Sequence, residues 1–76
     1  MDSYYKRIRE LREDHDLTQT EVAEYLKMKQ SEYWRYEHGY RDIPSDILIR
    51  LARFYHTSTD YILELTDNPK PYRDRK

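Results

Sequence analysis

The chain has 76 residues, of which 38% are charged and 37% apolar, and its formal net charge is -1 at pH 7. A chain of this length forms at most one domain with a small core, because it buries only about 60% of its unfolded surface. Because the sequence has no cysteine, disulfides and thiolate zinc sites are excluded. No signal peptide or membrane-length apolar run is visible, so we expect a cytoplasmic protein.

Two features favour a folded helical domain over disorder. High charge with low apolar content is typical of disordered chains, but nine tyrosines supply large side chains that can close a small core. The apolar residues also recur at helical spacing, and no strand or hairpin pattern is present. The sequence therefore predicts a compact all-α domain of five helices over residues 1–66, followed by a disordered basic tail over residues 67–76.

The first two helices are expected over about residues 3–14 and from residue 19 onward. Ser3 is the expected N-cap of the first, with Ile8 and Leu11 facing inward. Thr18 and Glu21 form the T-x-x-E pattern of a capping box at the start of the second. The inward residues of the second helix are expected to be Val22, Ala23 and Leu26.

The third helix is expected over about residues 30–38. Tyr33 and Tyr36 are interpreted as core residues at helical spacing. Trp34 projects about 100° from Tyr33, so it cannot share that burial. Gly39, the single glycine of the chain, can take the left-handed conformation that ends the helix.

Two further helices complete the expected domain. Pro44 suits the first turn of the fourth helix, where a missing amide proton costs nothing. Ser58 is the expected cap of a short fifth helix, with Asp60 near its positive end. The inward residues of the fourth helix are expected to be Ile47, Leu48, Leu51, Ala52 and Tyr55, and the fifth helix is expected to carry Tyr61, Ile62 and Leu65. Ile62, Leu63 and Leu65 either close the core or contact a second subunit.

Several segments together resemble the Cro/cI-like (XRE) helix-turn-helix domain of phage repressors and bacterial regulators. The matching pieces are RIRELRE, LTQTEVAEYL, YEHG, IPSDILIRLARFY and STDYIL, in the order and spacing of the family. The resemblance implies a lambda-repressor-like fold in which the second and third helices form the helix-turn-helix. It also implies sequence-specific binding of double-stranded DNA, with homodimers on an inverted repeat.

The resemblance assigns roles to residues by position. Arg12 and Glu37 match a partly buried ion pair between the first and third helices. The expected base-reading residues are Gln30, Ser31, Trp34 and Arg35. The expected contacts to the DNA backbone are Gln19, Lys29, His38, Tyr40 and Arg41.

The residue chemistry agrees with these roles. A glutamine amide can donate to and accept from the edge of adenine, and Arg35 can bind guanine or a phosphate. Positive charge also gathers near the third helix: residues 27–41 hold four basic against two acidic residues, whereas residues 42–68 hold two against five and residues 69–76 four against one.

The chain departs from the family pattern at three positions. Asp16 and Lys27 stand where relatives usually place glycine, and Lys27 would lose about 1 kcal/mol in a left-handed conformation. Trp34 stands where relatives often carry a smaller polar residue. Either it contacts DNA or a partner, or it is simply an exposed aromatic residue.

No catalytic or cofactor site is expected. The sequence has no nucleophile elbow, and one glycine cannot build a Gly-rich phosphate loop. His15 lies between two aspartates, but three consecutive residues do not easily converge on one metal ion, so a surface cap is favoured. The predicted function is a DNA-binding transcriptional repressor. The alternative is a protein-interaction module, including an antitoxin, that kept the fold and lost DNA binding.

Overall fold

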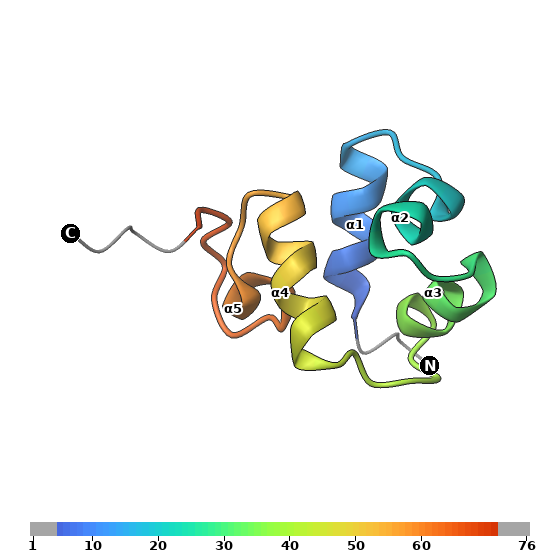
Figure 1. Cartoon of the computed structure of the whole chain (residues 1–76). Helices are drawn as coiled ribbons and strands as arrows, with labels where there is room; N and C mark the ends of the chain where they lie inside the picture. The colour runs from blue at the N-terminus through green and yellow to red at the C-terminus, as the bar shows by residue number, and fades with distance from the viewer. Residues whose placement is uncertain (1–4, 72–76) are drawn as a thin grey trace.

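The computed structural model describes residues 5–71, which contain five helices and no strand (Figure 1). This confirms the predicted all-α class. None of the helices in the described part is long and apolar enough to span a membrane. The helices are α1 (Lys6–Asp14), α2 (Gln19–Leu26), α3 (Gln30–Glu37), α4 (Ser45–Phe54) and α5 (Thr59–Ile62).

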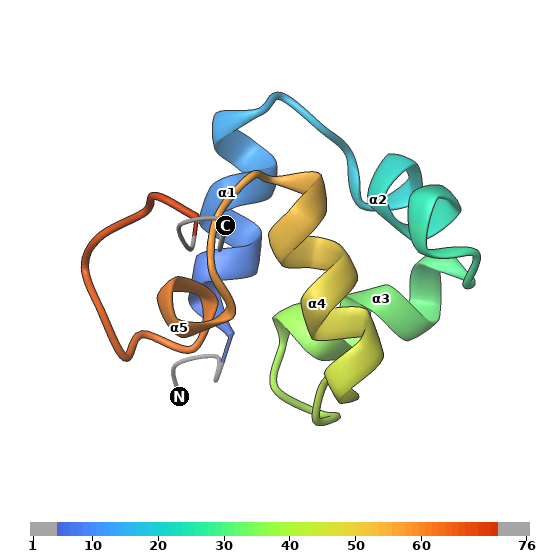
Figure 2. The same cartoon turned by 60° about the vertical axis from the view of Figure 1, so that its left-hand side comes forward.

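The helices are arranged in two groups that share α1. In Figures 1 and 2, α2 and α3 form one side of the molecule, and α4 and α5 lie on the other side of the core. Helix α1 packs against both α3 and α5. The core between them consists of Ile8, Val22, Ala23, Leu26, Tyr33, Tyr36, Ile43, Ile47, Leu51, Ala52, Tyr55 and Ile62.

The α2–α3 unit follows the sequence prediction closely. The amide of Glu21 donates to the Thr18 hydroxyl at 3.1 Å, and the Thr18 amide donates to the Glu21 carboxylate at 2.8 Å, which completes the capping box. Tyr33 and Tyr36 are buried, as predicted, and α3 ends at Glu37, one residue earlier than expected. The start of α2 is therefore capped, and one side of α3 is held in the core.

Some of the other helix boundaries differ from the predicted ones. Tyr5 is the N-cap of α1, and the expected cap Ser3 lies outside the described residues. Pro44 is the N-cap of α4 rather than part of its first turn, because its extended backbone (ψ 152°) precedes the helix. Ser58 caps α5 as predicted. Leu65, for which the sequence left a core position and a contact between subunits open, lies beyond the end of α5 and is 72% exposed.

Every helix is followed by a residue in the left-handed conformation. The residues are Asp16 (φ 56°), Lys27 (59°), Gly39 (74°), His56 (55°) and Glu64 (63°). The sequence predicted the glycine and identified Asp16 and Lys27 as the positions at risk, but it gave no sign of the other two. Three of the four connections between helices, and the segment after α5, thus use non-glycine residues in a conformation that costs most residues about 1 kcal/mol.

The described part of the expected tail lies against the helices. The Thr57 hydroxyl donates to the Pro69 carbonyl at 2.6 Å. Arg7 donates to the carbonyls of Tyr61 and Thr66, both at 3.0 Å, and reaches the Asp67 carboxylate at 3.1 Å. Residues beyond 71 lie outside the described part.

The left-handed turn at Lys27 gives a stability prediction. Replacing Lys27 with glycine should relieve the steric cost of φ 59°. We expect Lys27→Gly to unfold at a higher temperature than Lys27→Ala, which removes the same charge but keeps the Cβ. A difference of about 1 kcal/mol corresponds to roughly 4–8 °C for a domain of this size. Equal melting temperatures in thermal denaturation followed by circular dichroism would contradict the assignment.

Candidate nucleic-acid interface

Helix α3 has one buried and one exposed side. Tyr33 and Tyr36 are 0% and 4% exposed and hold the helix against the core. The opposite side carries two neighbouring stripes of side chains, and within each stripe the residues are four positions apart. All five are exposed: Gln30, Ser31, Trp34, Arg35 and His38.

A buried carboxylate joins α3 to α1 and α2. Glu37 is only 2% exposed, and it accepts hydrogen bonds from Nε and Nη2 of Arg12 at 2.7 and 3.2 Å. The Tyr33 hydroxyl and Nε2 of Gln19 also donate to it, at 2.5 and 3.1 Å. Nη1 of Arg12 also donates a hydrogen bond to the carbonyl of Leu17, in the connection that leads into α2. One carboxylate thus fixes the mutual positions of three helices.

The hydrogen bonds decide the charge state of this cluster. Burial by itself raises the pKa of Glu37, but the hydrogen bonds from Arg12, Tyr33 and Gln19 outweigh it and hold the pKa below its usual value. Burial and the neighbouring carboxylate raise the pKa of Tyr33, so its hydroxyl stays protonated as a donor. The hydrogen bond between Arg12 and Glu37 raises the pKa of Arg12, although the burial of Arg12 acts in the opposite direction.

The cluster extends to the exposed side of α3 through Gln19. While Gln19 donates to Glu37, its own Oε1 accepts a hydrogen bond from Nε2 of Gln30 at 2.6 Å. The Gln30 side chain is therefore oriented by a chain of two hydrogen bonds that begins at a buried anion. Its Oε1 and its second amide hydrogen remain for an external partner.

Three aromatic rings stack at the end of α3. The Trp34 ring lies 3.8 Å from that of His38 at an interplanar angle of 16°, and 5.6 Å from that of Tyr40 at 10°. Nδ1 of His38 also lies 3.0 Å from the Trp34 carbonyl oxygen. The loop brings Tyr40 back beside the helix because Gly39 turns the chain and the Tyr40 amide donates to the Arg35 carbonyl at 2.9 Å. No pattern in the sequence predicted this stack.

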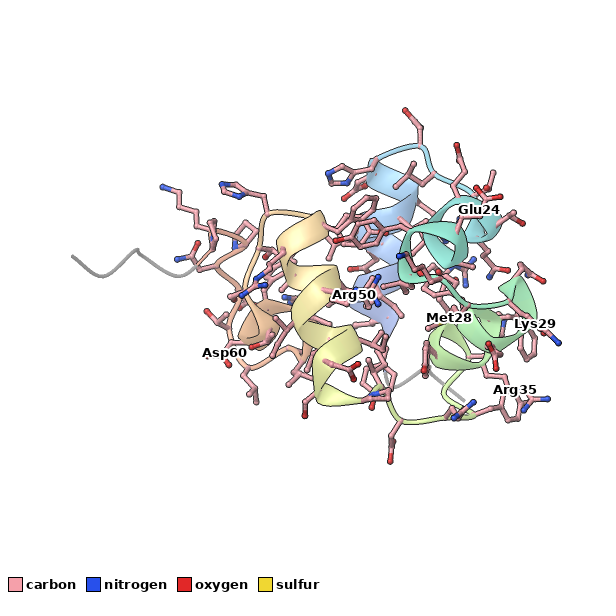
Figure 3. All side chains as sticks on the ribbon, in the orientation of Figure 1. Glu24, Met28, Lys29, Arg35, Arg50 and Asp60 are labelled. Atoms are coloured by element: carbon pink, nitrogen blue, oxygen red, sulfur yellow. The ribbon has the colours of Figure 1, made fainter. Side chains whose placement is uncertain are left out.

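Cationic side chains flank the same side. Arg35, with Trp34 and Tyr40, lines an open pocket on the surface. In Figure 3, Lys29 and Arg35 extend from the outer edge of the α2–α3 unit, whereas Asp60 lies at the opposite end of the molecule. Arg41 is exposed in the loop that follows. Positive charge is thus available around α3 although the whole chain is slightly acidic.

Other polar residues serve the fold. Arg50, which the sequence did not single out, donates to the carbonyls of Tyr25 and Leu26 at 2.9 and 3.4 Å and so ties α4 to the end of α2. His15 places Nδ1 2.8 Å from the Leu11 carbonyl oxygen and packs against Tyr55. Within residues 5–71, no three histidine or acidic side chains gather to hold a metal ion.

These features define a helix-turn-helix domain, and the comparison with known proteins assigns it to a family. The helix-turn-helix family matches residues 8–62, and the chain belongs to it, in its Cro/cI (XRE) group. The family is non-enzymatic. No solved structure matches the chain.

Two proteins of Bacillus subtilis (strain 168) are among its relatives. The chain is 45% identical over 73 residues to the uncharacterized HTH-type transcriptional regulator YobD, covering 96% of this chain and 65% of that protein. It is 41% identical over 58 residues to the HTH-type transcriptional regulator ImmR, covering 76% of this chain and 46% of that protein. The chain therefore spans less than two thirds of the length of either relative.

Two buried tyrosines provide a matched test of the cluster. The Tyr33 hydroxyl donates to Glu37, whereas the buried Tyr55 hydroxyl has no hydrogen-bond partner among the described residues. Tyr33→Phe should destabilise the domain by about 1.5–3 kcal/mol, because it removes a hydrogen bond to a charged group. Tyr55→Phe should be neutral or stabilising, because it removes an unsatisfied buried hydroxyl. Urea unfolding at pH 7 measures both, and equal losses would refute the assigned roles.

The lowered pKa of Glu37 predicts acid sensitivity. Because the folded-state pKa lies below the usual 4.5, the stabilisation is present above about pH 4.5 and is lost as pH falls through the folded-state value. Glu37→Gln should cost about 3–5 kcal/mol at pH 7, since it leaves Arg12 uncompensated, and should flatten the loss of stability below pH 4.5. The control Glu13→Gln breaks the exposed pair with Arg9, leaves the hydrogen bonds of Glu37 in place, and should cost less than about 1 kcal/mol. A steep acid slope that persists in Glu37→Gln would place its origin elsewhere.

Proposed function

We propose that the chain is a sequence-specific double-stranded DNA-binding domain of a transcriptional repressor, with α3 as the recognition helix in the major groove. The observation that carries the proposal is the exposed side of α3, on which Gln30 is oriented through Gln19 by the buried Glu37. If the Gln30 amide contacted only water, these hydrogen bonds would not be needed to orient it. A fixed amide suits base recognition, because a bidentate contact depends on geometry.

The proposed base contacts follow from side-chain chemistry. Gln30 presents an acceptor and a donor, which match N6 and N7 of adenine. Ser31, beside it, can donate to or accept from either base of a pair. Arg35, one turn later, offers a fork of donors that fits O6 and N7 of guanine or, failing that, a phosphate.

The proposed backbone contacts surround this row. Lys29 at the start of α3 and Arg41 after its end supply the charges, and His38 and Tyr40 add polar atoms near Arg41. Gln19 lies in the first turn of α2, so its backbone amide and its remaining side-chain hydrogen can bind a phosphate while its other atoms hold Gln30. These contacts fix the register and provide most of the salt-dependent affinity.

Repression would follow from occupancy of the operator. A homodimer on an inverted repeat places two recognition helices in successive major grooves, about 34 Å apart. Bound in this way, the protein blocks access of the polymerase to the promoter. The exposed Leu63 and Leu65 after α5 are available for a contact between subunits, whereas Ile62 is committed to the core.

Salt dependence tests the proposal directly. The logarithm of the binding constant of the wild-type protein for duplex DNA should fall linearly with the logarithm of the salt concentration. The slope should be about -0.9 for each phosphate that the protein neutralises. Arg41→Ala should weaken binding to all sequences alike and reduce the slope by about 1 per bound subunit. Gln30→Ala should instead relax base preference at one position by about 1–3 kcal/mol and leave the slope unchanged.

Fluorescence anisotropy of labelled duplexes measures both effects, with operators first selected from random DNA. If Gln30→Ala and Arg41→Ala act identically, the division between base and backbone contacts is wrong. Absence of DNA binding even at about 50 mM salt would refute the proposed function. It would favour the alternative of a protein-interaction module, for which the exposed aromatic side chains of Trp34 and Tyr40 provide a surface.

A further inference from the structure

We propose that the stacked Trp34 recognises the C5-methyl group of a pyrimidine, which in ordinary DNA is thymine. This inference rests on the proposed DNA binding and adds to it a specific chemical group on the DNA. Trp34 is the single tryptophan of the chain, it follows Gln30 by one turn of α3, and it is 38% exposed. It therefore lies on the side of α3 that is proposed to face the bases.

The stack favours one orientation of the indole. The rings of His38 and Tyr40 lie within 16° and 10° of parallel to it, at 3.8 and 5.6 Å between centroids. The His38 ring also contacts the Trp34 carbonyl oxygen, and the backbone of Tyr40 is positioned by the hydrogen bond from its amide to the Arg35 carbonyl. Both stacked rings favour this orientation of the indole, and its exposed part offers an apolar surface.

The base edges of the major groove offer one apolar match to such a surface. Most of their atoms are hydrogen-bond donors or acceptors, and covering one with an apolar ring costs free energy. The largest apolar group among them is the C5-methyl group of thymine. An indole has one N–H donor and an otherwise apolar perimeter, so a methyl group is the partner that costs nothing in lost hydrogen bonds.

The neighbouring pocket provides a place for the methyl group. It is lined by Trp34, Arg35 and Tyr40 and opens on the same surface. Its aromatic walls can take up the methyl group, while Arg35 remains beside it for an adjacent guanine or phosphate. Methylated cytosine carries the same group at the same place, so the proposed recognition is of the 5-methylpyrimidine edge rather than of thymine as a whole.

The test replaces each thymine of a selected operator in turn with deoxyuridine, which removes only the methyl group. We expect one thymine per half-site at which the change weakens wild-type binding by roughly three- to fivefold, the effect of one buried methyl group. At that position, a 5-methylcytosine–guanine pair should bind more tightly than a cytosine–guanine pair by a similar factor. Fluorescence anisotropy of labelled duplexes measures the affinity for each of these substituted operators, and it does not depend on tryptophan fluorescence.

Variants assign the effect to Trp34. In Trp34→Gln the penalty for deoxyuridine should vanish at that thymine, whereas the control Ile49→Gln, which changes an exposed apolar side chain of α4, should keep it. Firm binding with no thymine sensitive to loss of its methyl group would overturn this inference and leave the proposed function standing. A penalty that persists in Trp34→Gln would also overturn it. Failure to bind any duplex would refute the proposed function itself.

Discussion

The arrangement of the first three helices depends on the buried carboxylate of Glu37, which the surrounding side chains have to pair and hydrogen-bond. A charge removed from water is costly unless it is paired and its lone pairs are satisfied. Arg12 from α1, Gln19 from α2 and Tyr33 from α3 together meet this requirement. Because each donor lies on a different helix, the helices can satisfy the anion only in one mutual arrangement. In a domain with so small an apolar core, this polar cluster adds the geometric definition that packing alone supplies weakly.

The same cluster connects the interior to the surface. Gln19 bonds to Glu37 with one end of its amide and to Gln30 with the other, so a shift of α3 against α1 would move or release the exposed amide. Orientation of Gln30 therefore depends on the integrity of the fold. A hydrophobic replacement of the ion pair can preserve stability in other proteins, but here it would leave Gln19 without its anchor. This dependence gives a physical reason for keeping a costly charge in the core.

The sequence predicted what local chemistry determines, and the family resemblance added one distant contact, the ion pair of Arg12 and Glu37. Other contacts between distant residues were missed. The capping box of Thr18 and Glu21 and the left-handed Gly39 follow from residues within a few positions of one another, and both are present. Leu65 has the spacing of a core residue, but α5 ends before it. The stack on Trp34 depends on how the loop after Gly39 returns, and periodicity holds no information on that path. Polar partners such as Gln19 and Gln30 likewise depend on how the helices pack.

The turn between α2 and α3 shows how stability and binding can make opposite demands on one residue. Lys27 adopts a left-handed conformation that glycine would accept at lower cost. Its side chain, however, is exposed beside the start of α3 and adds a positive charge to a chain whose net charge is -1. Long-range attraction to phosphates depends on where the charges lie rather than on their sum. If the turn faces a polyanion, the attraction of the lysine charge offsets the conformational cost of this residue. If the turn faced only water, nothing would offset that cost.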